Sequence, residues 1–126
     1  MHVESTMLIP QWAARAILPW GTTTVCTDPH EIANMAGRQG VAFMLDNARR
    51  AGLRQYILAP SCVPAVPGLE SAGASFSAQD VAELLDMPGV IGIAEMMDYI
   101  SLAHGAERMR DIAAEGLRRG AYLQGH

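Results

Sequence analysis

Residues 22–31 read Thr-Thr-Thr-Val-Cys-Thr-Asp-Pro-His-Glu, and this stretch carries the pattern that decides the fold. Its first six residues are β-branched or apolar, which predicts a buried strand over 22–27. Asp28-Pro29 ends that strand. A helical spacing of apolar residues starts at Glu31. The unit is therefore a short buried strand, a few polar residues and then a helix.

The same unit recurs along the chain. Apolar segments alternate with helical patterns, and Ser77 and Asp80 form a capping arrangement at the start of the helix predicted over 77–87. Gly37 and Gly40 predict a break in the long helix. The predicted strands are 22–27, 56–59, 90–94 and 121–123, and the predicted helices are 10–19, 31–51, 77–87 and 105–119, with a long loop over 60–75.

Regular alternation of strands and helices predicts a parallel sheet with right-handed crossovers. The strands are apolar throughout, as expected when both faces of a sheet are covered. The sequence has neither GxGxxG nor GxxxxGK[ST], which disfavours a nucleotide-binding open sheet. Polar residues gather after the strands, where (β/α)8 barrels build their sites. Such a barrel needs about 250 residues, so we expect an α/β fold, a partial (β/α)8 TIM-type barrel of about strands 1–5 with helices 1–4, in which residues 1–126 form a single fragment.

Composition limits the function classes. The chain has 126 residues, half of them hydrophobic, and a net charge of −4, which suits a globular core and argues against a nucleic-acid partner. No signal peptide and no apolar run of about 18 residues is present, so a cytoplasmic enzyme without membrane contact is expected. Cys26 and Cys62 are predicted to be buried, reduced thiols.

Three metal-ligand residue types lie at the carboxyl ends of predicted strands or at the ends of the chain. They are His2, Glu95 and His126, and their nitrogen and oxygen atoms could bind a divalent metal. A structural role is the commoner outcome for any single histidine, and the sequence has neither HxxxH nor HExxH. Since two of these residues lie at the chain ends, we expect part of a larger enzyme.

Five segments together resemble the adenine deaminases of the metal-dependent amidohydrolase superfamily. The resemblance extends along the whole chain, and the Asp-Pro-His-Glu-Ile-Ala-Asn and Ser-Cys-Val-Pro-Ala segments are the most specific. The matching segments are residues 2–7, 21–25, 28–34, 61–65 and 94–97.

The resemblance implies a binuclear metal site with Mn²⁺ or Fe²⁺ that converts adenine and water into hypoxanthine and ammonia. It makes His2 the second histidine of a His-x-His pair and Glu95 a catalytic carboxylate that bridges both metals. His126 matches the ligand on the fifth barrel strand, although Gln124 stands where the family has Asp. Further ligands of the family, on the sixth and eighth strands, have no counterpart among these 126 residues.

The resemblance places three further residues after the second barrel strand, on the catalytic face: Asp28, His30 and Glu31. They could contact the purine or orient the metal ligands. Alternatively, Asp28 could cap the helix that follows, with Glu31 three residues further on.

Open strand edges in a half-barrel invite self-pairing, so a homo-oligomer is expected. We expect the chain alone not to deaminate adenine at a useful rate. One alternative is a short non-catalytic protein that self-assembles or binds a partner chain. A lesser alternative is a sibling amidohydrolase that acts on another cyclic amidine or amide.

Overall fold

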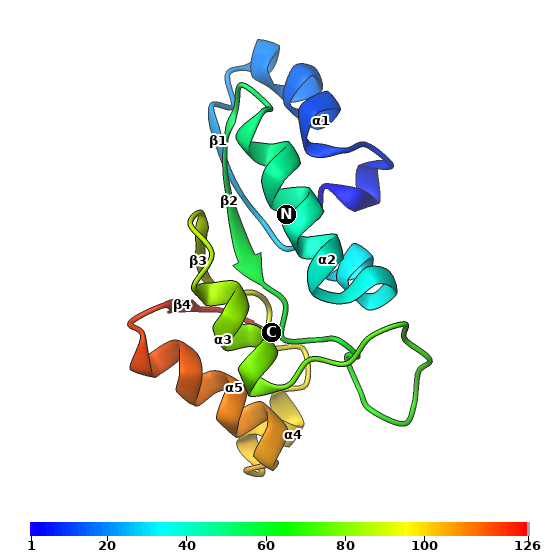
Figure 1. Ribbon diagram of the computed structural model, residues 1–126, viewed down its shortest axis with the longest axis vertical. Helices are drawn as coiled ribbons and strands as arrows, with labels where there is room; N and C mark the ends of the chain where they lie inside the picture. The colour runs from blue at the N-terminus through cyan, green and yellow to red at the C-terminus, as the bar shows by residue number, and fades with distance from the viewer. Residues whose placement is uncertain (126) are drawn as a thin grey trace.

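A computed structural model describes residues 1–125 of the protein, so His126 lies outside the described residues. Strands and helices alternate along the chain, as the sequence predicts (Figure 1). The strands are β1 (Thr24–Thr27), β2 (Arg54–Ala59), β3 (Val90–Ile93) and β4 (Tyr122–Leu123). The α-helices are α1 (Pro10–Ile17), α2 (His30–Arg49), α3 (Ala78–Leu85), α4 (Tyr99–Ala103) and α5 (Glu107–Arg118), and two short 3-10 helices cover Glu4–Thr6 and Leu18–Trp20.

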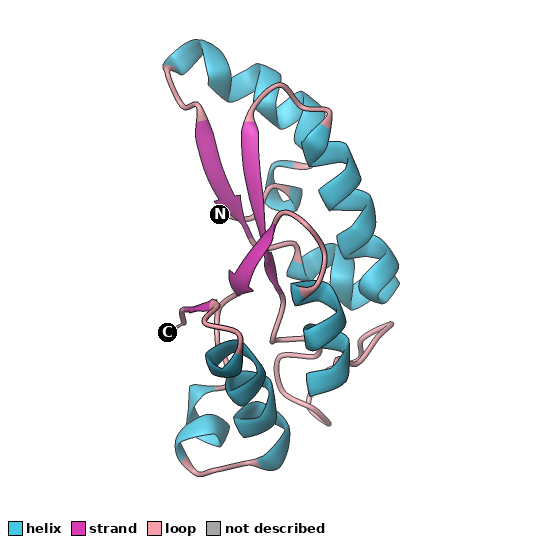
Figure 2. Ribbon diagram, turned by 60° about the vertical axis from the view of Figure 1, so that its left-hand side comes forward, coloured by secondary structure: helices cyan, strands magenta, loops and turns pink. Residues whose placement is uncertain are grey.

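The four strands form one parallel sheet in the order β1-β2-β3-β4, which is also their order in the chain. In Figure 2 helices α1, α2 and α3 lie to one side of the strands with the N-terminus towards the opposite side, and α4 and α5 lie below the strands. An open doubly-wound sheet would reverse its strand order and carry helices on both faces. Sequential order with helices on one side is the arrangement of a barrel. The predicted partial α/β barrel is therefore confirmed.

The hydrophobic core lies between the sheet and its helices. Fully buried aliphatic side chains from the strands meet those from α2, α3 and α5, and each contributes about 1.5–3 kcal/mol through burial. The valine, leucine and isoleucine members with no exposed surface are Val41, Ile57, Val63, Val81, Leu84, Ile93 and Ile112. This core fixes the crossover helices against the strands and so sets where each strand ends.

Two local predictions are confirmed in detail. Gly37 interrupts α2 with φ 58° and ψ −146°, a conformation that glycine adopts readily. Ser77 is the N-cap of α3, and its side chain and that of Asp80 make both hydrogen bonds of a capping box. The loop before α3 contains only an isolated bridge between Pro67 and Glu70 among the residues described.

The predicted burial of the first strand is wrong. Along β1 only Thr27 is buried, and Cys26 is exposed, whereas Cys62 is buried as predicted. Helices cover one side of the strands only, so alternate side chains of β1 face solvent in the residues described.

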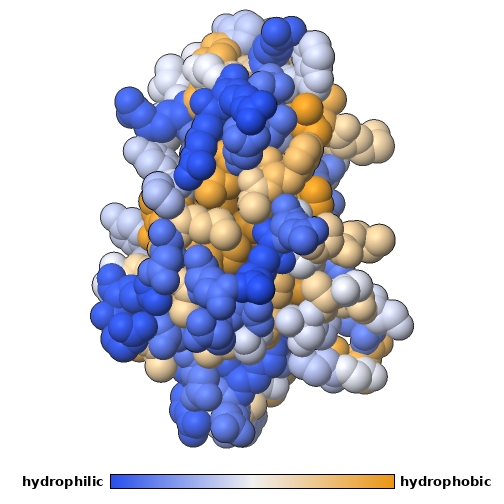
Figure 3. All heavy atoms as spheres, in the orientation of Figure 1, coloured by the Kyte–Doolittle hydropathy of each residue, from blue (hydrophilic) through white to orange (hydrophobic). Residues whose placement is uncertain are grey.

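Three large apolar side chains within the predicted helices are exposed. Trp12 is 53% exposed, Met35 78% and Leu117 71%. Trp12 stacks with the Arg15 guanidinium, which lies 4.5 Å from its ring centre. Figure 3 shows apolar side chains gathered around the middle of one face, beside α2. Among residues 1–125, no helix has the length and apolarity to cross a membrane.

Candidate metal centre

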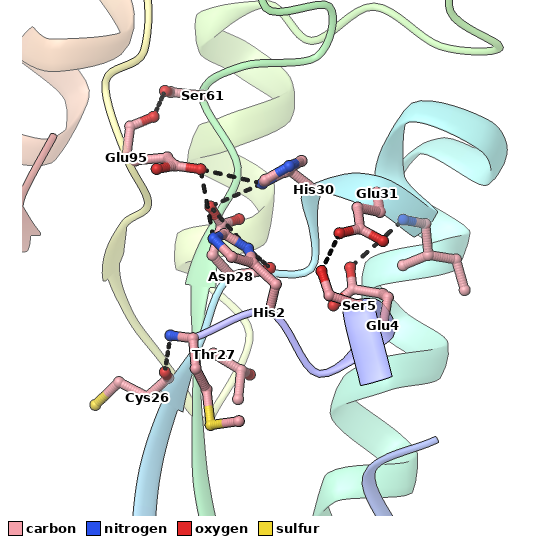
Figure 4. Close-up of polar contacts among 12 residues, drawn as sticks. His2, Glu4, Ser5, Cys26, Thr27, Asp28, His30, Glu31, Ser61 and Glu95 are labelled. Carbon is pink, nitrogen blue, oxygen red and sulfur yellow. Dashed lines mark hydrogen bonds and ion pairs between the residues drawn. The ribbon is translucent and has the colours of Figure 1, made fainter. Parts of the chain in front are cut away.

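Polar side chains converge at the carboxyl ends of the strands. Asp28 directly follows β1, Ser61 follows β2 after one proline, and Glu95 follows β3 after one alanine. In a parallel sheet these ends share one edge, so residues far apart in sequence meet there. Figure 4 shows the side chains turned towards one another.

His2 reaches the same edge through backbone pairing. The Met1 amino group donates to the Cys26 carbonyl at 3.0 Å, and the Asp28 N–H donates to the Met1 carbonyl at 2.9 Å. Two bonds that bracket one residue of the neighbour are the pattern of a parallel ladder. Met1 therefore lies alongside β1, and His2 is placed beside Asp28.

His2, Asp28, His30 and Glu95 form a compact group whose ligand-type atoms all lie within 4.8 Å of one another. His2 Nε2 lies 3.6 Å from Glu95 Oε1. His30 Nδ1 lies 3.1 Å from Asp28 Oδ2 and 3.4 Å from Glu95 Oε1. The two imidazole rings meet edge to face, with centres 4.6 Å apart. The structure thus brings together two histidines and two carboxylates that the sequence singled out.

The two histidines have different roles available to them. His2 Nδ1 lies 3.0 Å from the backbone carbonyl of Asp28, an oxygen that can only accept a hydrogen bond. With the proton on Nδ1, the lone pair of Nε2 points towards Glu95 and is free to bind a metal. His30 instead turns Nδ1 towards two carboxylates. His2 is therefore suited to ligation, and His30 to proton donation.

The charge of the site is balanced by His30. The hydrogen bond with Asp28 is the main reason that the pKa of His30 is raised to about 11, and a hydrogen bond with the Cys62 side chain adds to it, while burial acts in the opposite direction. At neutral pH His30 is then a cation that lies between two carboxylates. The Asp28 side chain is only 2% exposed, so this pairing offsets the cost of burying its charge.

One buried oxygen of the four-residue group has no hydrogen-bond partner among residues 1–125. Asp28 Oδ1 is buried and accepts no hydrogen bond from any of residues 1–125. A bound cation would satisfy such an atom. Two ligands about 2.1 Å from one ion are about 3.0–3.6 Å apart, depending on the angle between them, and the spacing of His2 Nε2 and Glu95 Oε1 lies at the upper end of that range. Imidazole and carboxylate donors suit a divalent transition metal, so the residues present fit a metal ion.

Asp28 does not cap α2, so the capping interpretation is wrong. The N-cap of α2 is Pro29, with no side-chain hydrogen bond. Glu4, from a distant part of the sequence, approaches the open helix end instead, with Oε1 3.5 Å from the Ile32 N–H. Glu31 turns away from the four-residue group and accepts a hydrogen bond from the Ser5 hydroxyl (Figure 4). The Asp28 side chain is therefore available to the four-residue group, and Glu31 is not part of that group.

The contribution of His126 stays a prediction, because that residue lies outside the described part of the chain. The pairing of β3 and β4 does extend towards it. The Met96 N–H, one residue beyond Glu95, donates to the Gln124 carbonyl at 2.9 Å. The backbone that leads to residue 126 is thus held beside the backbone of Glu95.

Sequence reasoning missed Arg108 and gave Ser61 no role. Ser61 is fully buried, and its hydroxyl donates to the Glu95 carbonyl at 2.7 Å. Arg108 donates to backbone carbonyls of the loop that begins at Ser61. A signal for Arg108 did exist, because it lies in the first turn of α5, where the helix dipole disfavours a cation.

A partial parallel barrel with nitrogen and oxygen ligands at its strand ends defines the class of metal-dependent α/β-barrel enzymes. The profile of the Amidohydrolase family matches residues 1–126. The chain therefore belongs to the amidohydrolase family, a family of hydrolases.

The chain is also similar over its whole length to individual proteins, several of which are adenine deaminases. Over all 126 residues the chain is 48% identical to an adenine deaminase of Ruegeria sp. (strain TM1040) and 48% identical to adenine deaminase 2 of Rhizobium etli, and it covers 21% of each relative. It is 44% identical to an adenine deaminase of Bacillus velezensis, of which it covers 22%. The chain thus spans about a fifth of the length of these relatives.

Proposed function

We propose that this chain supplies part of the active site of a metal-dependent adenine deaminase, which hydrolyses adenine to hypoxanthine and ammonia. The observation that carries the proposal is the cluster of His2, Asp28, His30 and Glu95 at the carboxyl edge of the sheet. The identity of 43–48% to adenine deaminases over the whole chain supports the choice of substrate. Because the chain spans a fifth of those relatives, the activity is proposed for the assembled site.

In this proposal His2 and Glu95 hold a divalent metal, with His126 as a further ligand. When bound, the metal, Mn²⁺ or Fe²⁺ by resemblance to the family, would lower the pKa of a water molecule and so supply the nucleophile. Ser61 fixes the backbone of Glu95 through its 2.7 Å hydrogen bond, and the Asp28 carbonyl fixes the tautomer of His2 at 3.0 Å. These two contacts orient the proposed ligands.

His30 is proposed as the residue that holds a proton at the site. Its raised pKa keeps Nδ1 protonated at neutral pH, principally because of Asp28. An imidazolium that is 18% exposed and borders Glu95 can donate a hydrogen bond to a carboxylate, or to a leaving amino group brought to this edge. After such a transfer the Asp28 carboxylate would favour return of a proton to His30, taken from the attacking water, and this would restore the charge balance.

A chimeric enzyme tests this proposal. The segment of the Ruegeria adenine deaminase that aligns with this chain would be replaced by these 126 residues, and ammonia release from adenine would be measured with Mn²⁺. We expect turnover, and we expect Glu95→Gln to abolish it. Glu107→Gln is the matched control, because Glu107 is exposed on α5 and should leave turnover unchanged. A folded, Mn²⁺-loaded chimera that leaves adenine intact would count against the proposed substrate.

The isolated chain gives a second arm of the test. We expect it to bind Mn²⁺ without useful ammonia release, and turnover that Glu95→Gln abolishes would contradict this. The exposed apolar side chain of Tyr122, 72% exposed on β4, favours self-association as an alternative role. Light scattering on the chain and on Tyr122→Ser would distinguish a specific oligomer from a monomer.

A further inference from the structure

Arg108 makes an unusual set of contacts for a surface arginine. Its Nε donates to the Phe76 carbonyl at 3.0 Å. Its Nη2 lies 3.0 Å from the carbonyls of both Ser61 and Val63, and 3.4 Å from that of Pro64. No carboxylate of residues 1–125 lies within 4.0 Å of its guanidinium nitrogens. The cation is thus bonded to carbonyl dipoles; burial lowers its pKa, and the charge of Asp98 acts in the opposite direction.

These carbonyls belong to the two ends of one long loop. Residues 61–64 begin the segment that follows β2, and Phe76 closes it just before α3. The Phe76 N–H also donates to the Val63 carbonyl at 2.7 Å. Arg108 therefore fastens both ends of the loop to α5, and a planar guanidinium with several fixed donors suits this geometry.

The beginning of that loop touches the candidate metal centre twice. The Ser61 hydroxyl donates to the Glu95 carbonyl at 2.7 Å (Figure 4). Cys62, which is 1% exposed, contacts His30 through its side chain. Any shift of residues 61 and 62 would move the groups that hold Glu95 and His30.

We propose that Arg108 is a positioning residue of the metal centre, which acts by holding Ser61 and Cys62 against Glu95 and His30. The inference rests on the proposed metal site. Arg110 on the same helix provides the contrast, because its guanidinium is exposed and, among residues 1–125, bonds only to its neighbour Asp111. A general stabilising effect of arginine on α5 would apply to both residues, whereas positioning applies to Arg108 alone.

Mn²⁺ affinity of the full 126-residue chain tests the proposal, measured by the loss of the free-ion electron paramagnetic resonance signal. Loss of groups that orient metal ligands weakens affinity about 10–100-fold, and we expect this for Arg108→Met. The control Arg110→Met should stay within about twofold. Arg108→Lys should give an intermediate value, because an ammonium cannot reach all four carbonyls. Ser61→Ala should weaken binding too, and its combination with Arg108→Met should add little, since both act through one contact.

Urea unfolding of every variant separates positioning from stability. A folded Arg108→Met chain that is less stable but binds Mn²⁺ as tightly as the parent would overturn the proposal. If Arg108→Met does not fold, unchanged affinity in both Arg108→Lys and Ser61→Ala would overturn it equally. A parent chain that binds no Mn²⁺ would refute the metal centre itself, and the positioning role with it.

Discussion

Replacing Gly92 by alanine should separate β4 from β3. Gly92 lies in β3 opposite Tyr122, and an added Cβ would lie 2.6 Å from the Tyr122 carbonyl oxygen and 2.8 Å from its Cβ. Carbon atoms pack best about 3.5–4.0 Å apart, so the strands would have to part by roughly 0.7 Å. The obstacle is largely backbone and therefore cannot be relieved by a rotamer change alone.

The size of the effect follows from two opposing contributions. Overpacking of this kind costs about 1–3 kcal/mol. Alanine recovers about 0.5–1 kcal/mol relative to glycine in a strand, because the unfolded chain loses less entropy. Taking the middle of each range, the net loss of unfolding free energy should be about 1 kcal/mol. Since β4 has only two residues, we expect the damage to appear chiefly there.

Urea unfolding and hydrogen exchange measure the two parts of this prediction. Exchange at the Met96 N–H, which donates to Gln124 at 2.9 Å, should accelerate in Gly92→Ala. Gly116→Ala is the matched control, because its Cβ would meet the Cδ1 atoms of Ile93 and Leu123, both at 2.7 Å, which are ends of flexible side chains. Alanine also gains about 1 kcal/mol of helix propensity there. The reasoning is refuted if Gly92→Ala is as stable as the parent, or if Gly116→Ala is the more damaging change.

Three further changes have predicted outcomes. Asp28→Asn should lower the unfolding free energy by about 2 kcal/mol, because a charged hydrogen bond to a buried group is lost. Urea unfolding at pH 7 with a chelator measures this. The exposed control Asp111→Asn should change the unfolding free energy by less than about 0.5 kcal/mol. Ser77→Ala should cost about 1 kcal/mol through the lost N-cap. The Ser77 hydrogen bond lowers the pKa of Asp80 in the folded chain. The stability that this bond contributes is present above the unfolded pKa of Asp80, near 3.9, and is lost as the pH falls through the lower folded pKa. Between pH 6 and 2.5 the unfolding free energy should therefore fall less steeply in Ser77→Ala than in the parent. Ile112→Val, in the core, should cost about 0.5–1.5 kcal/mol by thermal or urea unfolding, and no change would contradict the packing described.

Local signals predicted the elements of the fold because they depend on neighbours in sequence. The glycine at 37 and the Ser77 cap act within one turn of helix, and both were found where they were expected. Strand order followed from regular alternation, since a crossover between adjacent parallel strands leaves few other arrangements. A short helix, α4, was not predicted, and the Asp98 side chain begins it by accepting from the Ser101 N–H at 3.2 Å.

Exposure could not be predicted from the same signals. An apolar residue such as Cys26 or Leu117 is buried only if another element covers it, and spacing along one element does not say which face is covered. The contacts of Arg108, a polar residue, could not be predicted for the same reason. Its carbonyl partners lie between 32 and 47 residues away in sequence, so only the packing of α5 against the loop reveals them.

The candidate site was the more predictable part because strand ends are marked in sequence. Asp28 and Glu95 follow apolar strands directly, and parallel pairing then places them on one edge. Their geometry depends instead on backbone contacts: the Met1 ladder sets His2, and the Ser61 hydroxyl sets Glu95. A change at a proposed ligand therefore alters the chemistry of the site, whereas a change at Ser61 keeps the same donor atoms and alters only the distances between them. Comparing Glu95→Gln with Ser61→Ala thus separates the identity of the donors from their arrangement.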